Sequence, residues 1–237
     1  MTMKTLTFGH ATHTGHVRKQ NEDCYGYNAE IGLWLVADGM GGHAAGDIAS
    51  QVAVEHIVES CESGMDIRTA TATAHQAVIA AAERGLGHPD MGTTAVTLQI
   101  RDERYEVAWI GDSRAYLWDG KFLIRLTRDH SMVQDLVDGG LLPEEDARNY
   151  PFSNLLTRTI GIDKTTDVVA DTVSGKFETG QQILLCSDGL TNEVEDQDIK
   201  TILSGKGNPQ ERVDHLIDLA LANGGSDNVT AILVCHE

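Results

Sequence analysis

The chain has 237 residues, which is enough for one large domain or two small ones with a buried core. Its formal charge of −18, from 36 acidic and 18 basic residues, disfavours partners such as nucleic acids or anionic membranes. No apolar stretch is long enough for a signal peptide or a membrane span, and the four scattered cysteines form no C-x-x-C pair, so the sequence predicts a cytoplasmic protein.

Eight apolar runs have the length and residue types of β-strands. In chain order they are residues 33–37, 93–100, 105–110, 115–118, 122–126, 167–173, 182–186 and 229–235. Short turns such as RDER and WDGK separate the middle runs, which predicts that these runs pair as antiparallel hairpins.

Four segments carry apolar residues at helical spacing: 47–60, 66–84, 196–203 and 209–222. Asp47 is the expected N-cap of the first helix, and Pro209 suits the first turn of the last one. Consecutive strands with helices grouped in pairs predict an α+β layered domain rather than an alternating α/β fold. Residues 129–161 lack a strand pattern and predict either a mobile lid or a plain surface excursion.

Four aspartates stand at the ends of apolar runs. Asp38, Asp112 and Asp188 follow such runs in LVADG, VAWIGDS and ILLCSDG, and Asp227 precedes one in SDNVTAILV. A single Asp-Gly pair is typical of an ordinary turn, but strand ends on one edge of a layered fold can converge. Converging carboxylates repel one another unless a cation lies between them, and ligands that are all oxygen favour magnesium or manganese over zinc.

Two further features fit a site that binds a cation and a phosphate. Gly39 has no Cβ, so its carbonyl group can approach an ion closely. Arg18, in TGHVRKQNED, offers a planar guanidinium that matches two phosphate oxygens. Glu22 or Asp23 could add a carboxylate to the site, although this segment could equally be a cluster of surface ion pairs.

Eight motifs in order give the chain a family resemblance. They are TGHVRKQNED, LVADGMGGHAAGDIAS, MGTTAV, WIGDSRAYL, LTRDHSMVQ, NLLTRTIG, ILLCSDGL and SDNVTAILV. Together they resemble the PPM-type metal-dependent serine/threonine protein phosphatases (protein phosphatase type 2C), in their short bacterial form. The resemblance implies one domain over residues 1–237, a four-layer α-β-β-α sandwich of two antiparallel sheets flanked by helices, with a flap at about residues 129–161.

The resemblance also implies an activity: hydrolysis of phosphoserine and phosphothreonine in proteins by a hydroxide that bridges two Mn²⁺ or Mg²⁺ ions. The implied partners are phosphorylated proteins, including a bacterial Ser/Thr kinase and its targets. The resemblance assigns a role to each site residue. For the two core ions, it implies that Asp38 bridges both, that the Gly39 carbonyl completes the shell of one, and that Asp188 and Asp227 bind the other. It further implies that Glu22 acts mainly through metal-bound water, that Asp112 with Asp188 binds a weaker third ion, and that Arg18 binds the phosphate.

His43 has two interpretations. The resemblance implies that it is the general acid for the leaving group, but animal members place a histidine directly after Asp-Gly, where this chain has Met40. His43 could instead donate a hydrogen bond beside the metal ligands. Under the first interpretation its loss should impair hydrolysis of alkyl phosphates more than of activated aryl phosphates.

Three other functions were weighed. Residues 39–44 match the G-x-G-x-x-A pattern of dinucleotide-binding sites, with Glu59 about twenty residues later, but the charge of Asp38 would face a pyrophosphate. A phosphatase-like protein without activity predicts broken metal motifs, whereas Asp38, Gly39, Asp188 and Asp227 are present. A structural calcium module is disfavoured because no EF-hand loop pattern occurs.

Overall fold

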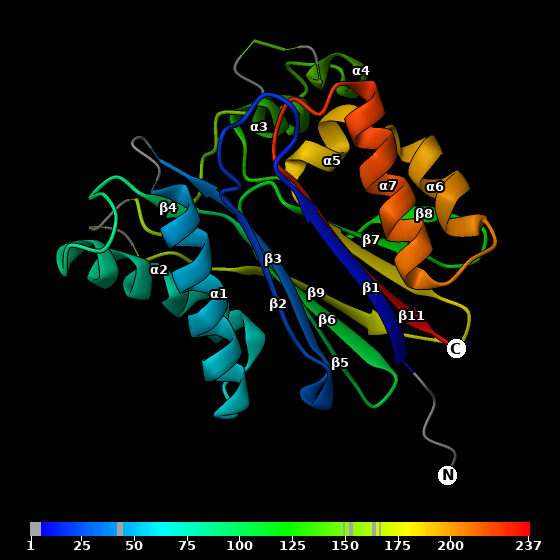
Figure 1. The fold of residues 1–237 in the computed structure, drawn as a ribbon, viewed down its shortest axis with the longest axis horizontal. Coiled ribbons are helices and arrows are strands. Elements are labelled where there is room, and N and C mark those ends of the chain that lie inside the picture. Colours follow the sequence, from blue (N-terminus) through cyan, green and yellow to red (C-terminus); the bar gives the residue numbers. More distant parts are fainter. Residues whose placement is uncertain (1–5, 42–44, 149, 152–153, 163–164, 166) are drawn as a thin grey trace.

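Two antiparallel β-sheets lie face to face in the computed structural model, which describes residues 6–41, 45–148, 150–151, 154–162, 165 and 167–237 (Figure 1). The first sheet has the strand order β1 (Leu6–His13), β11 (Val229–His236), β10 (Gln182–Cys186), β7 (Arg114–Trp118) and β8 (Leu123–Arg125). The second has the order β2 (Asp23–Asn28), β3 (Leu33–Met40), β5 (Ala95–Arg101), β6 (Arg104–Ile110) and β9 (Asp171–Lys176), and β4 (Gly92–Thr93) pairs with the end of β3. A 3-10 turn, η1 (Ala29–Ile31), connects β2 to β3.

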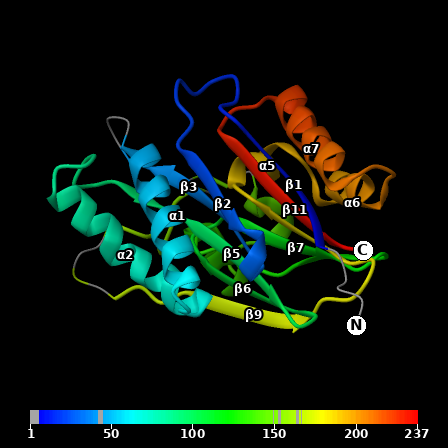
Figure 2. The ribbon, with the colours of Figure 1, turned by 60° about the horizontal axis from the view of Figure 1, so that its bottom comes forward.

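Helices cover the outer face of each sheet (Figure 2). The second sheet is covered by α1 (Gly46–Glu62) and α2 (Ile67–Glu83), and the first by α5 (Asp188–Glu193), α6 (Asp196–Ser204) and α7 (Pro209–Asn223). Two short helices, α3 (Met132–Asp138) and α4 (Glu144–Ala147), lie beyond one end of the sheets, in the region of residues 129–161 that we call the flap. The four-layer α-β-β-α prediction is therefore confirmed.

The central strands are apolar on both sides because both sides are buried. In β3, Leu33 and Leu35 pack toward α1 and α2, whereas Trp34 and Val36 pack toward the other sheet. The two-residue alternation of a strand thus serves two separate cores, which explains the uninterrupted apolar run. Burial of such a side chain contributes about 1.5–3 kcal/mol each, so these strands hold a rigid frame for whatever lies at their ends.

The sequence patterns did not predict the strands that are rich in polar residues. β1 and β2 were not predicted, because LTFGHATH and DCYGYN place His, Thr and Asn among few apolar residues. β9 begins at Asp171, later than the predicted residue 167. The prediction of hairpins is confirmed at RDER, between β5 and β6, and at WDGK, between β7 and β8, whereas β6 and β7 belong to different sheets.

Helix ends followed the predicted signals in part. Asp66 caps α2 by accepting a hydrogen bond from the Thr69 N–H at 2.9 Å, and Pro209 occupies the first turn of α7. Asp47 is not an N-cap: Ala45 holds that position without a side-chain hydrogen bond, and Asp47 lies in the first turn of α1. An acidic residue there still interacts favourably with the helix dipole.

The dinucleotide-binding alternative is wrong. Such sites use parallel strands joined by crossover helices, whereas β3 pairs antiparallel with both β2 and β5. Glu59 also lies inside α1 rather than at the end of a following strand. Across the described residues, none of the helices combines the length and the apolar character needed to cross a membrane.

Candidate metal centre

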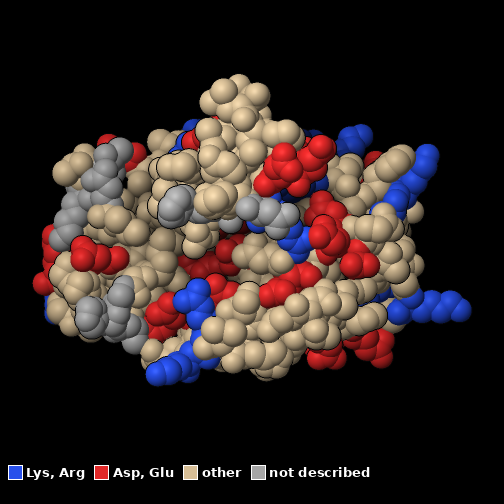
Figure 3. All heavy atoms as spheres, turned by 90° about the horizontal axis from the view of Figure 1, so that it is seen from above, with Lys and Arg blue, Asp and Glu red and all other residues tan. Residues whose placement is uncertain are grey.

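The predicted site residues meet at one end of the sandwich, in a cavity of about 450 Å³. Figure 3 shows Asp and Glu side chains gathered in a hollow on this face, with Lys and Arg side chains beside it. The cavity is lined by every predicted site residue that the structure describes: Arg18, Glu22, Asp38, Gly39, Asp112, Asp188 and Asp227. His43 lies outside the described residues.

Asp38 lies within β3 rather than after it. The predicted strand ends at residue 37, but β3 continues to Met40 because β4 pairs with its last residues. The Asp38 N–H donates to Thr94 Oγ1 at 3.0 Å, and the Asp38 carbonyl accepts from the Thr94 N–H at 2.9 Å. Thr94 thus holds the backbone of Asp38 at both its N–H and its carbonyl, and Asp38 lines the cavity.

Gly39 is required by packing as well as by any ligand role. A Cβ atom at this position would lie 2.1 Å from the Gly46 carbonyl oxygen and 2.5 Å from the Glu22 carbonyl oxygen. Both clashes involve backbone, so no side-chain movement can relieve them. The missing side chain therefore lets the first turn of α1 and the start of β2 close around the site.

Glu22 joins the site to helix α1. Its carboxylate accepts a hydrogen bond from the Gly46 N–H at the start of α1, where the helix dipole favours negative charge. Even so, burial raises the pKa of Glu22. Asn228 positions the whole segment: its Oδ1 accepts from the Glu22 N–H at 2.8 Å, and its Nδ2 donates to the carbonyls of Thr14 and Gln20 at 2.8 and 2.9 Å.

Asp112 and Asp188 come from the first residues after two strands. Asp112 follows Gly111 in the turn between β6 and β7, and Asp188 is the first residue of α5 after β10. Asn192, one turn further along α5, donates from Nδ2 to Asp188 Oδ2 at 3.1 Å and so orients that carboxyl. Gly111 adopts φ +104°, and a Cβ there would clash with Thr94 at 2.5 Å.

Arg18 and Asp227 form an ion pair at the mouth of the cavity. Arg18 Nη2 lies 2.7 Å from Asp227 Oδ2, and the Arg18 side chain remains 54% exposed. This hydrogen bond and charge raise the pKa of Arg18, which stays cationic. Among the described residues, Asp227 is the carboxylate that pairs with Arg18, and the exposed guanidinium has further N–H donors.

The carboxyls at the base of the cavity resist ionisation together. Burial, reinforced by the charges of neighbouring carboxylates, raises the pKa values of Asp23, Asp38, Asp112 and Asp188, and for Asp23 to about 7. The carboxyls of Asp38 and Asp188 share a hydrogen bond. Asp23 Oδ2 accepts from Ser187 Oγ at 2.8 Å, whereas the buried Oδ1 of Asp23 lacks a hydrogen-bond partner among the residues that the structure describes. A cation would relieve this repulsion.

Comparisons with known proteins identify the family. The model of the family described as protein phosphatase 2C matches residues 13–205. The chain is 36% identical to the serine/threonine phosphatase stp of Listeria monocytogenes, over 94% of this chain and 93% of that protein. The chain belongs to the protein phosphatase 2C family.

Solved structures of phosphatases match the fold closely. The crystal structure of the Mycobacterium tuberculosis phosphatase PstP/Ppp has a TM-score of 0.89 and 34% identity, covering 98% of this chain and 99% of that one. The PstP catalytic domain described in complex with two manganese ions has a TM-score of 0.86 and 32% identity, covering 97% of both chains. The predicted family, fold and metal-dependent phosphatase activity are therefore confirmed.

The donor atoms of this protein phosphatase 2C fit manganese or magnesium. The carboxyl groups around the cavity and the Gly39 carbonyl supply only oxygen, which hard divalent cations prefer. In the part of the chain that the structure describes, no three His, Cys, Asp or Glu side chains already form a compact ligand cluster. Instead, Asp38 pairs with Asp188, and Asp227 pairs with Arg18, so a bound ion would compete with the proton of the first pair and with the guanidinium of the second.

The sequence analysis missed the residues that hold the ligands in place. Asp23 was considered only as an alternative to Glu22, and Thr94, Asn192 and Asn228 were not singled out. A partial signal existed, because Asn228 lies in the SDN motif beside Asp227. Asp23 and Thr94 likewise lie in the motifs TGHVRKQNED and MGTTAV, but nothing in those motifs assigns them a role. Asn192 carries no local signal, because its role depends on its place in α5.

We expect the stability of this phosphatase in chelator to fall as pH rises from about 5 to 7. A carboxyl whose folded-state pKa is raised holds its proton in the folded protein after the unfolded chain has lost it. Asp23, whose pKa is raised to about 7, therefore costs up to ~1.4 kcal/mol per pH unit between about pH 4 and 7, and its cost no longer grows at higher pH. His56 and His130, with lowered pKa values, oppose this fall below about 6.5, but they are two groups against the four buried carboxyls.

Urea unfolding in EDTA across this pH range measures the slope, and Asp23→Asn should make it shallower. Excess Mn²⁺ should raise stability and weaken the pH dependence, because a bound cation favours the ionised carboxylates. Stability in EDTA that is flat or rises between pH 5 and 7 would contradict the prediction.

Proposed function

We propose that this chain removes phosphate from phosphoserine and phosphothreonine in proteins, at the cavity formed by the ends of both sheets. The single observation that supports this function most is the convergence of four aspartates from four distant segments beside an exposed arginine: Asp38, Asp112, Asp188 and Asp227 with Arg18. Oxygen ligands and a guanidinium are complementary to cations and to phosphate, respectively.

We assign Mn²⁺ or Mg²⁺ to two core positions. Asp38 would contact both ions, the Gly39 carbonyl one of them, and Asp188 and Asp227 the other, while Glu22 would contribute indirectly. When bound, a pair of such ions lowers the pKa of water toward neutrality and offsets the charge of the phosphate.

Asp112 extends this set. It shares the cavity with Asp188, and burial raises the pKa of both carboxyls. The two are our proposed ligands of a weaker third ion.

Arg18 is the proposed phosphate-binding residue. It lies on the loop between β1 and β2, which Asn228 fixes through the carbonyls of Thr14 and Gln20. Its guanidinium would donate to the phosphate oxygens that do not react, and would stabilise the charge that develops on them during transfer. This role requires Arg18 to move from Asp227, which costs little because exposed ion pairs contribute about 0–1 kcal/mol.

His43 is the proposed general acid. It follows β3 and precedes α1 in sequence, and Met40 and Gly41, shortly before it, line the cavity. We expect His43→Ala to reduce kcat on a phosphothreonine peptide about 10²-fold, with a much smaller effect on p-nitrophenyl phosphate, whose leaving group needs no proton. Steady-state kinetics on both substrates measure the difference. Equal losses would indicate instead that His43 only donates a hydrogen bond near the ligands.

The wider setting follows from the substrate class. Phosphorylated proteins, including a Ser/Thr kinase and its targets, are the proposed partners, and the cytoplasm, where kinases find ATP, is the proposed location. Residues 1–237 are proposed to form one phosphatase domain, with the flap at residues 129–161 influencing which protein substrates are accepted.

Hydrolysis of a phosphothreonine peptide, with and without Mn²⁺, tests the function. We expect phosphate release that requires Mn²⁺ or Mg²⁺, stops in EDTA and returns when the ion is restored in excess. A phosphotyrosine peptide of the same sequence serves as the substrate control. If the folded, Mn²⁺-saturated protein releases no phosphate, the proposal is wrong, and a protein that only binds phosphoproteins becomes the better explanation.

A further inference from the structure

A second cavity, of about 290 Å³, adjoins the metal centre on the side of the flap. Asp112 and Asp188 line both cavities, so the two spaces meet at these carboxyls. Flap helices α3 and α4 line one side of the second cavity, and α5 lines another. The flap and the helix that begins with a proposed metal ligand therefore lie on either side of one space.

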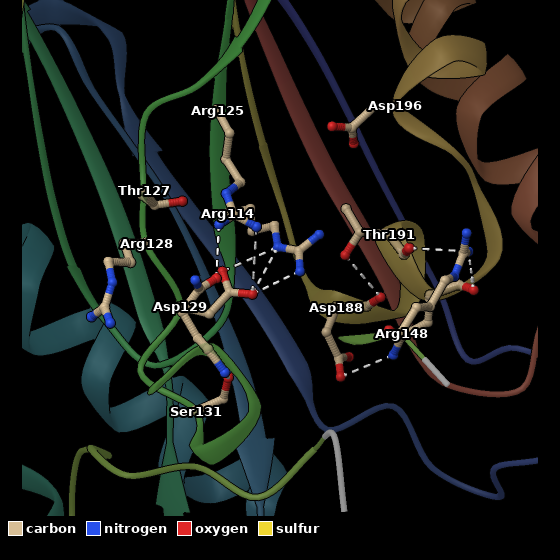
Figure 4. A network of polar contacts seen from close by, with 12 residues as sticks. Arg114, Arg125, Thr127, Arg128, Asp129, Ser131, Arg148, Asp188, Thr191 and Asp196 are labelled. Atoms are coloured by element: carbon tan, nitrogen blue, oxygen red, sulfur yellow. Dashed lines mark hydrogen bonds and ion pairs between the residues drawn. The ribbon is translucent and has the colours of Figure 1, made fainter. Parts of the chain in front are cut away.

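Arg148 connects the two sides. It directly follows α4, and its Nη2 donates hydrogen bonds to the backbone carbonyls of Thr191, at 3.2 Å, and of Asn192 (Figure 4). Its Nη1 pairs with Glu195, just after α5. We call these interactions the Arg148 contact.

Helix α5 needs a partner at this end. The last carbonyls of a helix lack intrahelical donors, and a cation there also interacts favourably with the helix dipole. α5 has six residues and no basic residue in its last turn. Arg148, 43 residues away from Thr191 in sequence, donates from the flap to the carbonyls of Thr191 and Asn192 and supplies positive charge. The carbonyl of Glu193, the last residue of α5, accepts instead from Asn223 of α7 at 2.8 Å.

One turn of helix α5 links the Arg148 contact to Asp188, the proposed metal ligand. Asn192, whose carbonyl accepts from Arg148, donates through its own side chain to Asp188 Oδ2 at 3.1 Å. Because α5 is a single short element, a shift of its last carbonyls also shifts the Asn192 side chain, and with it the direction of the Asp188 carboxyl. Figure 4 shows Arg148, Thr191 and Asp188 grouped at this helix.

We propose that Arg148 is a positioning residue, through which the flap holds α5 and orients Asp188. The inference rests on the proposed function, because it assumes that Asp188 is a metal ligand. It couples two features that otherwise look separate: engagement of the flap against α5 favours metal binding, and metal binding favours the engaged flap. By reciprocity, both effects have the same size.

The carbonyl hydrogen bonds, rather than the ion pair, should carry the effect. The Glu195 side chain is 69% exposed, and an exposed ion pair is weak and screened by salt. Glu195→Gln should therefore behave nearly as the wild type. Arg148→Lys keeps the charge but loses the planar fork that reaches two carbonyls, so it should lie between wild type and Arg148→Met.

Two measurements on the full chain test the proposal without relying on turnover: the Mn²⁺ dissociation constant by calorimetry, and amide hydrogen exchange across residues 188–193. We expect Arg148→Met to weaken Mn²⁺ binding roughly tenfold, the low end of the effect of residues that support metal ligands, and to speed exchange in α5. Asn192→Leu should weaken Mn²⁺ binding without speeding exchange, because it breaks only the step to Asp188.

Arg128→Met is the matched control. Arg128 lies near the base of the flap, pairs with Asp135 and Asp138 there, and does not line the second cavity. It should leave both readouts unchanged. Wild-type Mn²⁺ affinity and wild-type α5 exchange in Arg148→Met would overturn the proposal. An equal effect of Arg128→Met would also overturn it, because the changes would then result from a general loss of flap stability.

The outcome separates this inference from the proposed function. If no variant hydrolyses phosphothreonine, yet Arg148→Met weakens Mn²⁺ binding and speeds α5 exchange, the coupling stands and the substrate assignment fails. If hydrolysis is normal and neither readout responds, Arg148 is a surface residue and the coupling fails alone.

Discussion

Asp38→Asn should lower kcat/KM on a phosphothreonine peptide at least ~10³-fold while stabilising the protein in chelator. The loss follows because Asp38 is the proposed ligand of both core ions, and such ions supply several kcal/mol of transition-state stabilisation, each 1.36 kcal/mol being about tenfold. The gain follows because burial and the charges of Asp23 and Asp188 disfavour the Asp38 carboxylate, and asparagine is neutral at every pH. Few substitutions at purely structural positions would lower activity and raise stability together.

Steady-state kinetics on the phosphothreonine peptide and thermal unfolding in EDTA at pH 7.5 provide the two readouts, and calorimetry measures Mn²⁺ binding. Each kcal/mol gained should raise the melting temperature by roughly 2–4 °C in a domain of this size. Asp218→Asn, the same change at an exposed position on α7, should alter neither activity nor Mn²⁺ binding. A folded Asp38→Asn protein with full activity, or one less stable than wild type in EDTA, would refute the assigned role.

The strands that matter most for the site were also the most predictable. β10 was predicted with its observed bounds, and β3 and β11 with their correct starts, because each is buried on both faces and consists mainly of apolar residues. The same contrast between an apolar run and a terminal carboxylate revealed Asp38, Asp188 and Asp227. A charge placed beside a fully buried strand is conspicuous in sequence and costly in energy, so it signals chemistry.

What could not be predicted depends on tertiary contacts. α5 has the sequence DGLTNE, whose glycine and asparagine suggest a turn, and the helix forms against the core through Leu190. Asn228 orders the loop that carries Arg18 through hydrogen bonds to residues more than 200 positions away. The Arg148 contact uses backbone carbonyl acceptors, which every residue possesses. Sequence patterns thus identify candidate ligands, but not the groups that orient them.

Arg18 has two binding partners in this site: Asp227 in the structure and, as proposed, the phosphate of the substrate. Its ion pair with Asp227 neutralises a proposed metal ligand, so the guanidinium and a cation compete for the same carboxylate. The guanidinium is also the proposed phosphate donor. Binding of metal to Asp227 therefore releases Arg18 toward the substrate, which makes ion and phosphate binding mutually favourable.

Arg18→Met should separate these two effects. We expect kcat/KM on a phosphothreonine peptide to fall about 10²–10³-fold, the range found when one preorganised donor to a developing charge is removed, and inhibition by inorganic phosphate to weaken. Mn²⁺ affinity should stay the same or rise, because Asp227 loses its competing partner.

The controls distinguish charge from geometry. Arg18→Lys, which keeps the charge without the fork, should recover only part of the loss, and Lys19→Met, at an exposed neighbouring position, should have little effect. Calorimetry with Mn²⁺ and phosphate inhibition kinetics measure both arms. Weaker Mn²⁺ binding in Arg18→Met would show that the arginine supports the metal ligands, and unchanged kcat/KM would show that it does not hold the phosphate. The first result would exclude the competition between guanidinium and cation that the short Arg18–Asp227 contact implies, and the second would exclude its coupling to phosphate binding.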